Sequence, residues 1–362
     1  MKVFLIVSAI IILFFLGIRY FLFKIGDPVN AKVSNSYFHH YRKNLIVYSP
    51  MGNWFELGYF ESDADVATFQ PINIDFGKDK NSIFWKGRKQ SVDYDTFEID
   101  DSYIIKDKNH VYITNRKSFD LLEIIDGADP KTYQLLDASL KDHRRNNWFK
   151  DAHAVYYKNK KIEGDPKTFH PVNDMIAVDA NFIYAIISYR GEGLEMLGVD
   201  EVIQKHKIIE GEIHPINESY AQIGNAVVSA FTNAEFEIHT FDTIKTIRKI
   251  DYWSVIVDDI LINKGVLYPE IDAESFEIIE NDFSRDKNSI YYCCKKIVGA
   301  EYSSFKIISD KYSVDRKNVY FRNAIVKGAN PETFQSASEY DVWQDGQNRY
   351  KDGKAISSLS NK

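Results

Sequence analysis

Short apolar and aromatic runs alternate along this chain with small clusters of Asp, Asn, Lys and Gly. Runs such as Ile290-Tyr291-Tyr292 are β-branched and aromatic, which favours a half-buried strand. The polar clusters between the runs are typical of turns, because Asp and Asn side chains bond their own backbone. The pattern therefore predicts many short strands that are joined by tight turns.

Two of the polar phrases recur. The first reads Lys-Asp-Lys-Asn followed by an apolar-aromatic pair, and its copies begin at Lys78, Lys106 and Arg285, with a weaker copy from Asp315. The second reads Gly-Ala-Asp-Pro-Lys-Thr-aromatic or close to it, and its copies end at Tyr133, Phe169 and Phe334. In the second phrase Asp is a good N-cap and Pro suits the first helical position, which predicts one helical turn.

The two phrases keep an even spacing. Asn81 to Phe97 and Asn318 to Phe334 are each 16 residues, and Phe97 to Asn109 is 12. A unit is therefore about 28–30 residues, and roughly eight or nine units fill residues 35–355. This predicts an all-β repeat protein of stacked small antiparallel sheets with single-turn helices, solenoid-like or propeller-like, with two to three strands per unit. The recurring aromatics should occupy equivalent interior places, at Phe97, Phe169, Phe276, Phe305 and Phe334.

The amino terminus differs from the rest of the chain. Residues 3–23 are almost entirely apolar, which is long enough to cross a bilayer as a helix. We expect a transmembrane signal anchor at 1–24, a linker at 25–36, the repeat domain at 37–356 and a disordered tail at 357–362. A signal peptide cleaved after Ala31 is the alternative. The large carboxy-terminal part should be translocated.

Charge and cysteine content narrow the possible partners. The chain has 45 basic and 52 acidic residues, a net charge of −7, which argues against nucleic acid. Its two cysteines, Cys293 and Cys294, are adjacent and unsuited to a disulfide framework. Strand alternation would place one inside and one outside, as a buried small side chain beside a spectator thiol.

A dedicated site is expected where the repeat is broken, at residues 113–150 and 185–258. The first break contains His143, Arg144, Arg145 and Trp148, a composition typical of an interaction hot spot, and otherwise a solvated loop. The second contains Arg190 and Glu195, then a short amphipathic helix expected at residues 199–206, then Glu212 and His214.

Metal and cofactor sites are not predicted. The group His206, Glu210, Glu212 and His214 has ligand chemistry, but its spacing matches no zinc arrangement. The recurring Asp and Asn of the first phrase could suggest calcium loops. However, a Lys stands inside each triplet and the loop glycine is missing, so turn formation is the preferred interpretation.

At these phrases the chain resembles the DKNYY family, over most of residues 40–355. The resemblance is specific at 78–112, 155–169 and 286–334, and weak at 185–258. It implies an exported or membrane-anchored bacterial repeat protein, and it supplies no catalytic residues.

Two functions are therefore considered. The first is a single-pass bacterial membrane protein whose large domain, in the periplasm or outside the cell, is a non-enzymatic scaffold for a protein or glycan. Immunity against an envelope-targeted toxin is a special case. The alternative is a hydrolase with its site in residues 185–258. The scaffold is preferred because the chain lacks the common catalytic templates.

Overall fold

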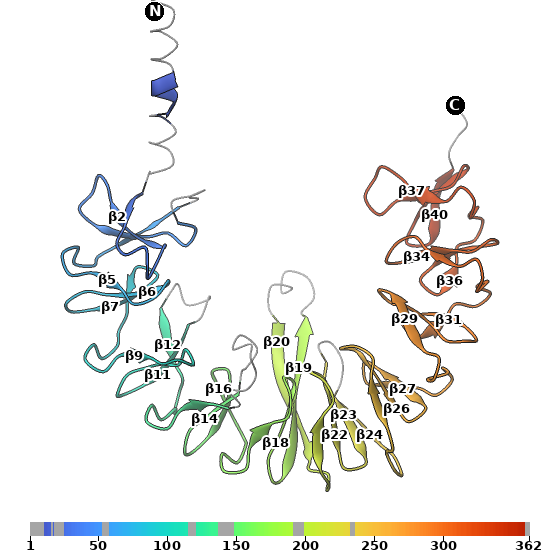
Figure 1. Cartoon of the computed structure of the whole chain (residues 1–362), viewed down its shortest axis with the longest axis horizontal. Coiled ribbons are helices and arrows are strands. Elements are labelled where there is room, and N and C mark those ends of the chain that lie inside the picture. The colour runs from blue at the N-terminus through green and yellow to red at the C-terminus, as the bar shows by residue number, and fades with distance from the viewer. Residues whose placement is uncertain are drawn as a thin grey trace, which may run out of the picture. The chain divides into compact units, whose positions relative to one another are not determined.

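The computed structural model describes residues 11–15, 17, 25–52, 58–114, 121–136, 148–190, 199–231 and 236–358. The chain forms two compact units, Met1–Pro171 and Val172–Lys362. Within the described residues each unit is a series of small antiparallel sheets, with almost no helix (Figure 1). The predicted all-β repeat class is therefore confirmed.

Unit 1 contains four sheets of four strands each, followed by one more strand. Their bounds are β1 Gly26–Pro28, β2 Tyr37–His40, β3 Ile46–Tyr48, β4 Phe60–Ser62; β5 Gln70–Pro71, β6 Phe76–Lys78, β7 Ile83–Trp85, β8 Arg88–Lys89; β9 Glu98–Ile99, β10 Ile105–Lys106, β11 Val111–Thr114, β12 Leu122–Ile124; β13 Gln134–Leu135, β14 Trp148–Lys150, β15 Val155–Tyr157, β16 Lys160–Ile162; and β17 His170–Pro171.

Unit 2 begins with three strands and continues with five sheets of four strands. Their bounds are β18 Ile176–Val178, β19 Phe182–Arg190, β20 Val199–Lys207; β21 Ile213–Pro215, β22 Tyr220–Ile223, β23 Ala226–Ser229, β24 Glu237–Thr240; β25 Ile247–Lys249, β26 Ser254–Val257, β27 Ile260–Asn263, β28 Val266–Tyr268; β29 Glu277–Glu280, β30 Phe283–Arg285, β31 Ile290–Tyr292, β32 Lys295–Lys296; β33 Lys306–Ile307, β34 Tyr312–Val314, β35 Val319–Phe321, β36 Ala324–Ile325; and β37 Gln335–Ser336, β38 Trp343–Gln344, β39 Asn348–Lys351, β40 Lys354–Ser358.

Each four-stranded sheet is a meander whose strands pair in chain order. The prediction of two to three strands per unit is wrong, because a fourth strand follows each hairpin. In some sheets this strand consists of two polar residues, as in β8 and β32, so its sequence carries no apolar alternation. Four strands fit into 28–30 residues only because most strands have two to four residues.

The two ends of each sheet have different connections. At one end, which we call the turn edge, the loop between the first two strands lies beside the hairpin between the last two. The Lys86 N–H donates to the Asp75 carbonyl at 2.7 Å across this edge, and Lys264 donates to Trp253 at 2.8 Å in the same way. At the other end, the motif edge, the first recurring phrase joins the second and third strands, and the second phrase enters the first strand.

The hairpins at the turn edge have the left-handed backbone that their residues predict. Lys86 and Gly87 have φ of 50° and 80°, and Lys264 and Gly265 have 49° and 78°. Two successive positive φ values are typical of the tight turn that matches strand twist. Glycine at the second position avoids the steric cost that other residues meet there.

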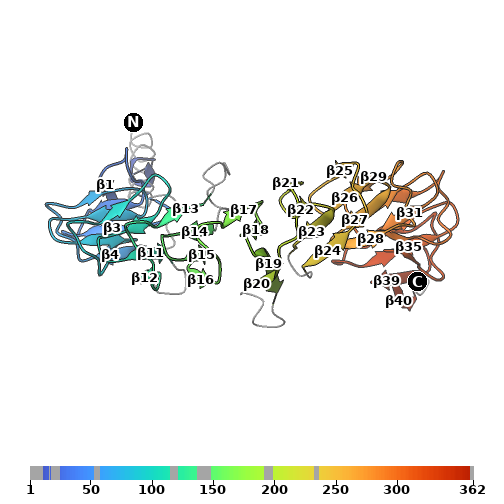
Figure 2. The ribbon, with the colours of Figure 1, turned by 90° about the horizontal axis from the view of Figure 1, so that it is seen from below.

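Neighbouring sheets pack together through shared apolar clusters. Phe76 and Trp85 of one sheet lie in a single apolar cluster with Ile105 and Tyr112 of the next. The recurring aromatics enter these clusters as predicted: Phe69, Tyr133, Phe169, Phe276 and Phe334 are buried, and Phe97 and Phe305 are half-buried. Burying such a side chain stabilises the fold by about 1.5–3 kcal/mol. In unit 2, Figure 2 shows the first strands β21, β25 and β29 along one side and the last strands β24 and β28 along the other.

The region 185–258 is more regular than its sequence indicates. Residues 213–240 and 247–268 form complete meanders. The expected helix at residues 199–206 is wrong, because Val199–Lys207 is strand β20 and pairs with β19 over nine residues. This strand is stabilised by its partner, and tertiary pairing overrides the helical periodicity of its sequence.

The ends of the repeat domain also differ from the predicted boundaries. The expected linker at 25–36 contains β1, whose Gly26 to Pro28 pair with β2 in the first sheet. The predicted tail at 357–362 begins inside β40, and residues 359–362 lie outside the described part. Residues 11–15 are helical, but most of the predicted anchor at 1–24 lies outside the described residues. None of the helical residues described forms a helix that is long and apolar enough to cross a membrane.

Candidate functional site

The aspartate of the first phrase is the centre of a buried hydrogen-bond network at the motif edge. One oxygen of Asp107 accepts from the backbone N–H groups of Asn109 at 2.7 Å and His110 at 2.9 Å. Its other oxygen accepts from the Asp93 N–H at 2.7 Å and the Tyr112 hydroxyl at 2.6 Å. Burial acts to raise the pKa of Asp107, but the Tyr112 hydroxyl and the backbone donors outweigh it and lower that pKa.

The same network locks the two phrases together. Asp93 begins the second phrase, and its own carboxylate accepts from the N–H and hydroxyl of Thr96. The Thr96 hydroxyl in turn accepts from the Lys108 N–H at 3.0 Å, and the Lys108 ammonium lies 2.7 Å from Asp93. Asp93, Thr96, Asp107 and Lys108 are therefore bonded to one another at this junction.

The network recurs along the chain. An aspartate and the tyrosine five residues later are bonded in six described copies: Asp107–Tyr112, Asp151–Tyr156, Asp179–Tyr184, Asp286–Tyr291, Asp315–Tyr320 and Asp345–Tyr350. These carboxylates already accept from N–H and O–H donors, which leaves them unsuited to a cation. The turn-forming interpretation of the phrase therefore explains these contacts better than a calcium loop does.

The phrase disappears from the middle of the chain because a different turn replaces the aspartate network. Between β22 and β23, Gly224 has a φ of 54°, and a Cβ there would lie 2.4 Å from the Glu210 carbonyl oxygen. Between β26 and β27, Asp258 accepts from the N–H groups of Lys245 and Thr246. The strands around these turns are mostly apolar, and all four residues of Ala226–Ser229 are buried.

The first group of predicted site residues is largely outside the described part. His143, Arg144 and Arg145 fall in residues 137–147, which the structure does not describe. Trp148 is only 1% exposed and packs against Tyr157 and Phe169 with ring centroids 4.9 and 5.2 Å away. The prediction of an exposed binding tryptophan is therefore corrected, because Trp148 is a core residue of β14.

The second group is not brought together into a site. Arg190 is the last residue of β19, and Glu195 lies outside the described residues. Glu212 and His214 are exposed and approach one another to 3.2 Å, the geometry of a surface pair. His206 is exposed on β20. Among the described residues there is no cluster of three or more His, Cys, Asp or Glu side chains that could hold a metal ion.

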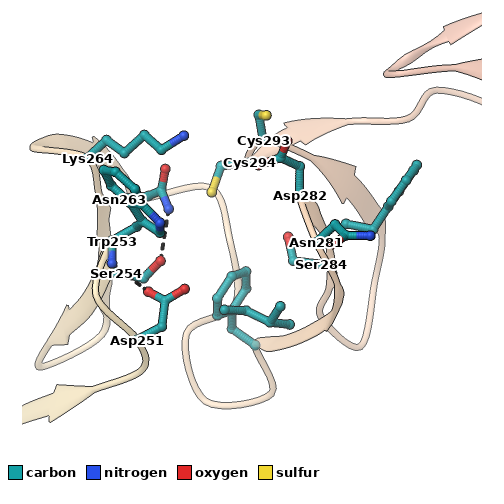
Figure 3. A pocket seen from close by; sticks show the side chains of 13 residues that line it. Asp251, Trp253, Ser254, Asn263, Lys264, Asn281, Asp282, Ser284, Cys293 and Cys294 are labelled. Carbon is teal, nitrogen blue, oxygen red and sulfur yellow. Dashed lines mark hydrogen bonds between the residues drawn. The ribbon is translucent and has the colours of Figure 1, made fainter. Parts of the chain in front are cut away.

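Several cavities lie at the turn edge, between successive sheets. Others of about 550 Å³ lie elsewhere in unit 2, one of them beside Asp315 and Arg316 at the motif edge. In unit 1, cavities of about 570 Å³ and about 110 Å³ lie on the two sides of Tyr103. In unit 2, a smaller cavity of about 50 Å³ lies between the sheets β25–β28 and β29–β32 (Figure 3). Sequence reasoning missed these places because each is made by segments that lie far apart in the sequence.

A cation over an aromatic ring recurs beside these cavities. The Lys86 ammonium lies 4.8 Å from the centroid of the Trp85 ring, and the Lys264 ammonium lies 5.0 Å from that of Trp253. Both lysines occupy the first, left-handed position of a hairpin. Attraction between the ammonium and the ring holds the lysine arm against the turn edge.

The adjacent cysteines lie in one such hairpin. Cys293 and Cys294 have φ of 47° and 58°, so they form the turn after β31 and are not in a strand. As predicted, one is buried and the other half-buried, and Figure 3 shows their sulfurs pointing in different directions. Burial raises the pKa of both thiols, to about 12 at Cys294. Both are therefore thiols rather than thiolates at neutral pH, which makes them weak nucleophiles.

Comparison with known proteins agrees with the recurring phrases. No curated protein and no solved structure matches the chain. The family model of the DKNYY family matches residues 19–160 and 117–354, which together cover nearly all of the described sheets. The chain therefore belongs to the DKNYY family.

Proposed function

We propose that this protein is a membrane-tethered scaffold without catalytic activity of its own, which binds a protein or glycan partner in the bacterial envelope. The apolar residues 3–23 would be its single-pass anchor, and the sheets would face the periplasm or the cell exterior. The motif edge contributes to stability, since the recurring aspartates there accept hydrogen bonds from within their own unit.

The observation that carries the proposal is the repeated construction of the turn edge. Cavities between sheets occur there in both units, beside lysines that lie over Trp85 and Trp253. Aromatic rings and cations at a surface are typical of recognition sites, because both give large interaction energies per residue. A stack of repeats presents such sites in a row.

Affinity capture tests the binding role. The full chain, tagged at its carboxy terminus and extracted from its native envelope, should retain a specific partner that mass spectrometry identifies. Capture should be lost when Lys86 and Lys264 are both replaced by Glu. It should be unchanged when Lys131 and Lys317, two exposed lysines at the motif edge, are replaced by Glu. A deletion strain without an envelope phenotype, together with no retained partner, would count against the scaffold.

Membrane topology is tested separately. Protease added to intact spheroplasts should digest the sheet domain. Without protease, the protein should remain with the membrane fraction unless the chain is cleaved after Ala31. Complete protection of the domain in intact spheroplasts would contradict the proposed orientation.

Immunity is the special case of this proposal in which the partner is a toxin that acts in the envelope. A toxin gene beside the gene for this chain would support it. Survival of the deletion strain when that toxin is delivered would exclude it.

A further inference from the structure

Side-chain bonds close three of the described junctions at the turn edge. The Asn173 amide donates to the Asn217 carbonyl at 2.8 Å, and the Asn217 amide donates to the Asp251 carbonyl at 2.9 Å. In unit 1 the Tyr37 hydroxyl donates to the Asp75 carbonyl at 2.6 Å. In each case a polar side chain of one sheet bonds the first loop of the next sheet.

The junction between the sheets β5–β8 and β9–β12 is not closed in this way. The Asn73 oxygen accepts from the N–H groups of Asp75 and Phe76, as the equivalent asparagines do in their own loops. The Asn73 amide nitrogen, however, has no hydrogen-bond partner among the described residues. Asn73 is one of the residues that line the cavity at this junction.

The next loop has a different conformation. Its Asp100 carboxylate accepts from the N–H groups of Ser102 and Ile104, and this turns the chain so that Tyr103 has a φ of 59°. A left-handed backbone is uncommon for a bulky residue and costs on the order of 1–2 kcal/mol. The ring is also 71% exposed, so burial does not offset this cost. Strain that packing does not explain is a sign of a functional position.

The open junction is a cavity of about 570 Å³, within the range of about 300–1,000 Å³ found for small-molecule sites. Tyr103 and Ile74, which is 54% exposed, supply its apolar surface. Asn73 and Lys86 supply donors. The Asp75 carboxylate supplies an acceptor, and it is held in place by the Tyr48 hydroxyl.

We propose that this cavity binds an oligosaccharide that contains N-acetylated hexosamine. The C–H face of a sugar ring packs on the exposed Tyr103 ring. The sugar hydroxyl groups donate to the Asp75 carboxylate and accept from the Lys86 ammonium. The acetamido carbonyl accepts from the free Asn73 amide, and the acetamido methyl group contacts Ile74. This inference rests on the proposed binding function and names its ligand class.

A sugar fits this place better than an extended peptide. A peptide that adds to a sheet needs a free strand edge, whose N–H and C=O groups it pairs. The cavity lies between loops at the ends of the strands, where polar side chains and one exposed ring provide the contacts.

Isothermal titration calorimetry on the full chain in detergent micelles tests the proposal. The probes are the tetramer of β-1,4-linked N-acetylglucosamine and, as the matched β-1,4-linked sugar without acetamido groups, cellotetraose. We expect saturable binding of the first probe and at least about tenfold weaker binding of the second. No binding of the acetylated tetramer, or equal binding of both, would overturn the assignment.

Three variants locate the site. Tyr103→Asn should abolish most of the binding while the protein remains as stable or becomes more stable, because Asn tolerates the left-handed backbone. Asn73→Asp should weaken binding at least about tenfold, because it keeps the oxygen that the loop requires and removes the N–H donors. The control Tyr340→Asn removes a 96% exposed tyrosine elsewhere and should change nothing.

The experimental results distinguish a failure of the sugar site from a failure of the proposed scaffold function. Tetramer binding that survives Tyr103→Asn would place the sugar elsewhere and overturn the site. Loss of a captured envelope protein in Tyr103→Asn, with no tetramer binding by the unaltered chain, would assign the cavity to a protein instead. Failure of the topology experiment would affect only the proposed orientation, because the calorimetry uses purified protein.

Discussion

At the residue scale, both carboxylate oxygens of the recurring aspartate are saturated by donors. Asp286 accepts from the N–H groups of Asn288 and Ser289 at 2.7 and 2.8 Å. It also accepts from the Asp272 N–H at 2.9 Å and the Tyr291 hydroxyl at 2.7 Å. Hydrogen bonds to a charged group contribute about 1.5–3 kcal/mol each.

Replacing Asp286 by Asn should destabilise unit 2 by roughly 2–3 kcal/mol. The amide keeps one acceptor oxygen but turns N–H donors toward the Asp272 N–H and the Tyr291 hydroxyl, which then lack an acceptor. Urea unfolding followed by circular dichroism measures the change. Asp310→Asn, at an exposed aspartate of the same unit, is the control and should stay within about 0.5 kcal/mol. Equal effects of the two variants would contradict the network.

The two cysteines should react very differently with a thiol reagent. In the native protein at about pH 8, 5,5′-dithiobis(2-nitrobenzoic acid) should modify the half-buried Cys293 slowly and leave Cys294 unmodified. Cys294 packs with Phe276 and Tyr291, and burial raises the pKa of its thiol to about 12. Unfolding in guanidinium should expose both thiols. Rapid reaction of both in the native state, or of neither after unfolding, would show that the hairpin differs from this structure.

The residue types of the first phrase predicted that it forms a turn. They did not predict which groups bond its aspartate. Clustered Asp and Asn residues indicate a turn because the bonds that form it are local. The Asp107 carboxylate accepts from the N–H groups of Asn109 and His110, two and three residues later. The bonds to Asp93 and Tyr112 require the second phrase and the following strand to lie beside the same carboxylate. Tyr103 carried no sequence signal, because only its backbone angle and exposure distinguish it from other loop tyrosines.

At the element scale, tight hairpins determine how closely successive sheets approach. Gly353, in the hairpin before β40, has a φ of 74°, and a Cβ there would lie 2.7 Å from the Phe321 Cβ of the preceding sheet. Gly328 has a φ of 78°, but a Cβ there would meet nothing within 4 Å. The two glycines therefore share the backbone requirement and differ in packing.

Gly353→Ala should destabilise unit 2 more than Gly328→Ala, by at least about 1 kcal/mol in the free energy of unfolding. Both variants lose the conformational freedom of glycine at positive φ, so the difference reports the contact between the hairpin and Phe321. Thermal and urea unfolding of the two proteins provide the comparison. Equal losses would mean that the last sheet does not pack on its neighbour at this position.

Short strands were the least predictable elements. A strand of two residues, such as β8 or β32, has no periodicity, and its pairing is determined by the hairpin that precedes it. Residues 199–206 have helical spacing, yet nine consecutive pairs with β19 make them a strand. Trp148 stands next to clustered Arg residues in the sequence. The turn after β14, which resembles the first phrase, nevertheless places this tryptophan in the core.

At the scale of the whole molecule, the repeated aspartates link stability to pH. The pKa values of five of them are lowered, because tyrosine and backbone donors outweigh the effect of burial: Asp107, Asp151, Asp286, Asp315 and Asp345. In the unfolded chain an aspartate titrates near 3.9. The folded protein therefore binds fewer protons, and its stability is complete above that value and falls as the pH drops through the folded pKa values.

We expect the urea midpoint to change little between about pH 7 and 5, and to fall steeply between about pH 4 and 3. The Asp286→Asn variant lacks one of these groups and should show a smaller fall in that interval. Circular dichroism at a series of pH values measures both. A midpoint that is unchanged at about pH 3, or an equal fall in the variant, would contradict the role of these carboxylates.

The hydrogen bonds described here act locally along the chain: even the bond from the Gly87 N–H to the Tyr37 hydroxyl spans only 50 residues, from one sheet to the next. A segment of about 28–30 residues is thus a structural unit whose hydrogen bonds are formed within the unit or with its immediate neighbours. Gene duplication or loss of one such unit would change the number of stacked sheets, while the contacts within each remaining pair of neighbours stay the same. Evolution can in this way vary the size of the protein in fixed steps.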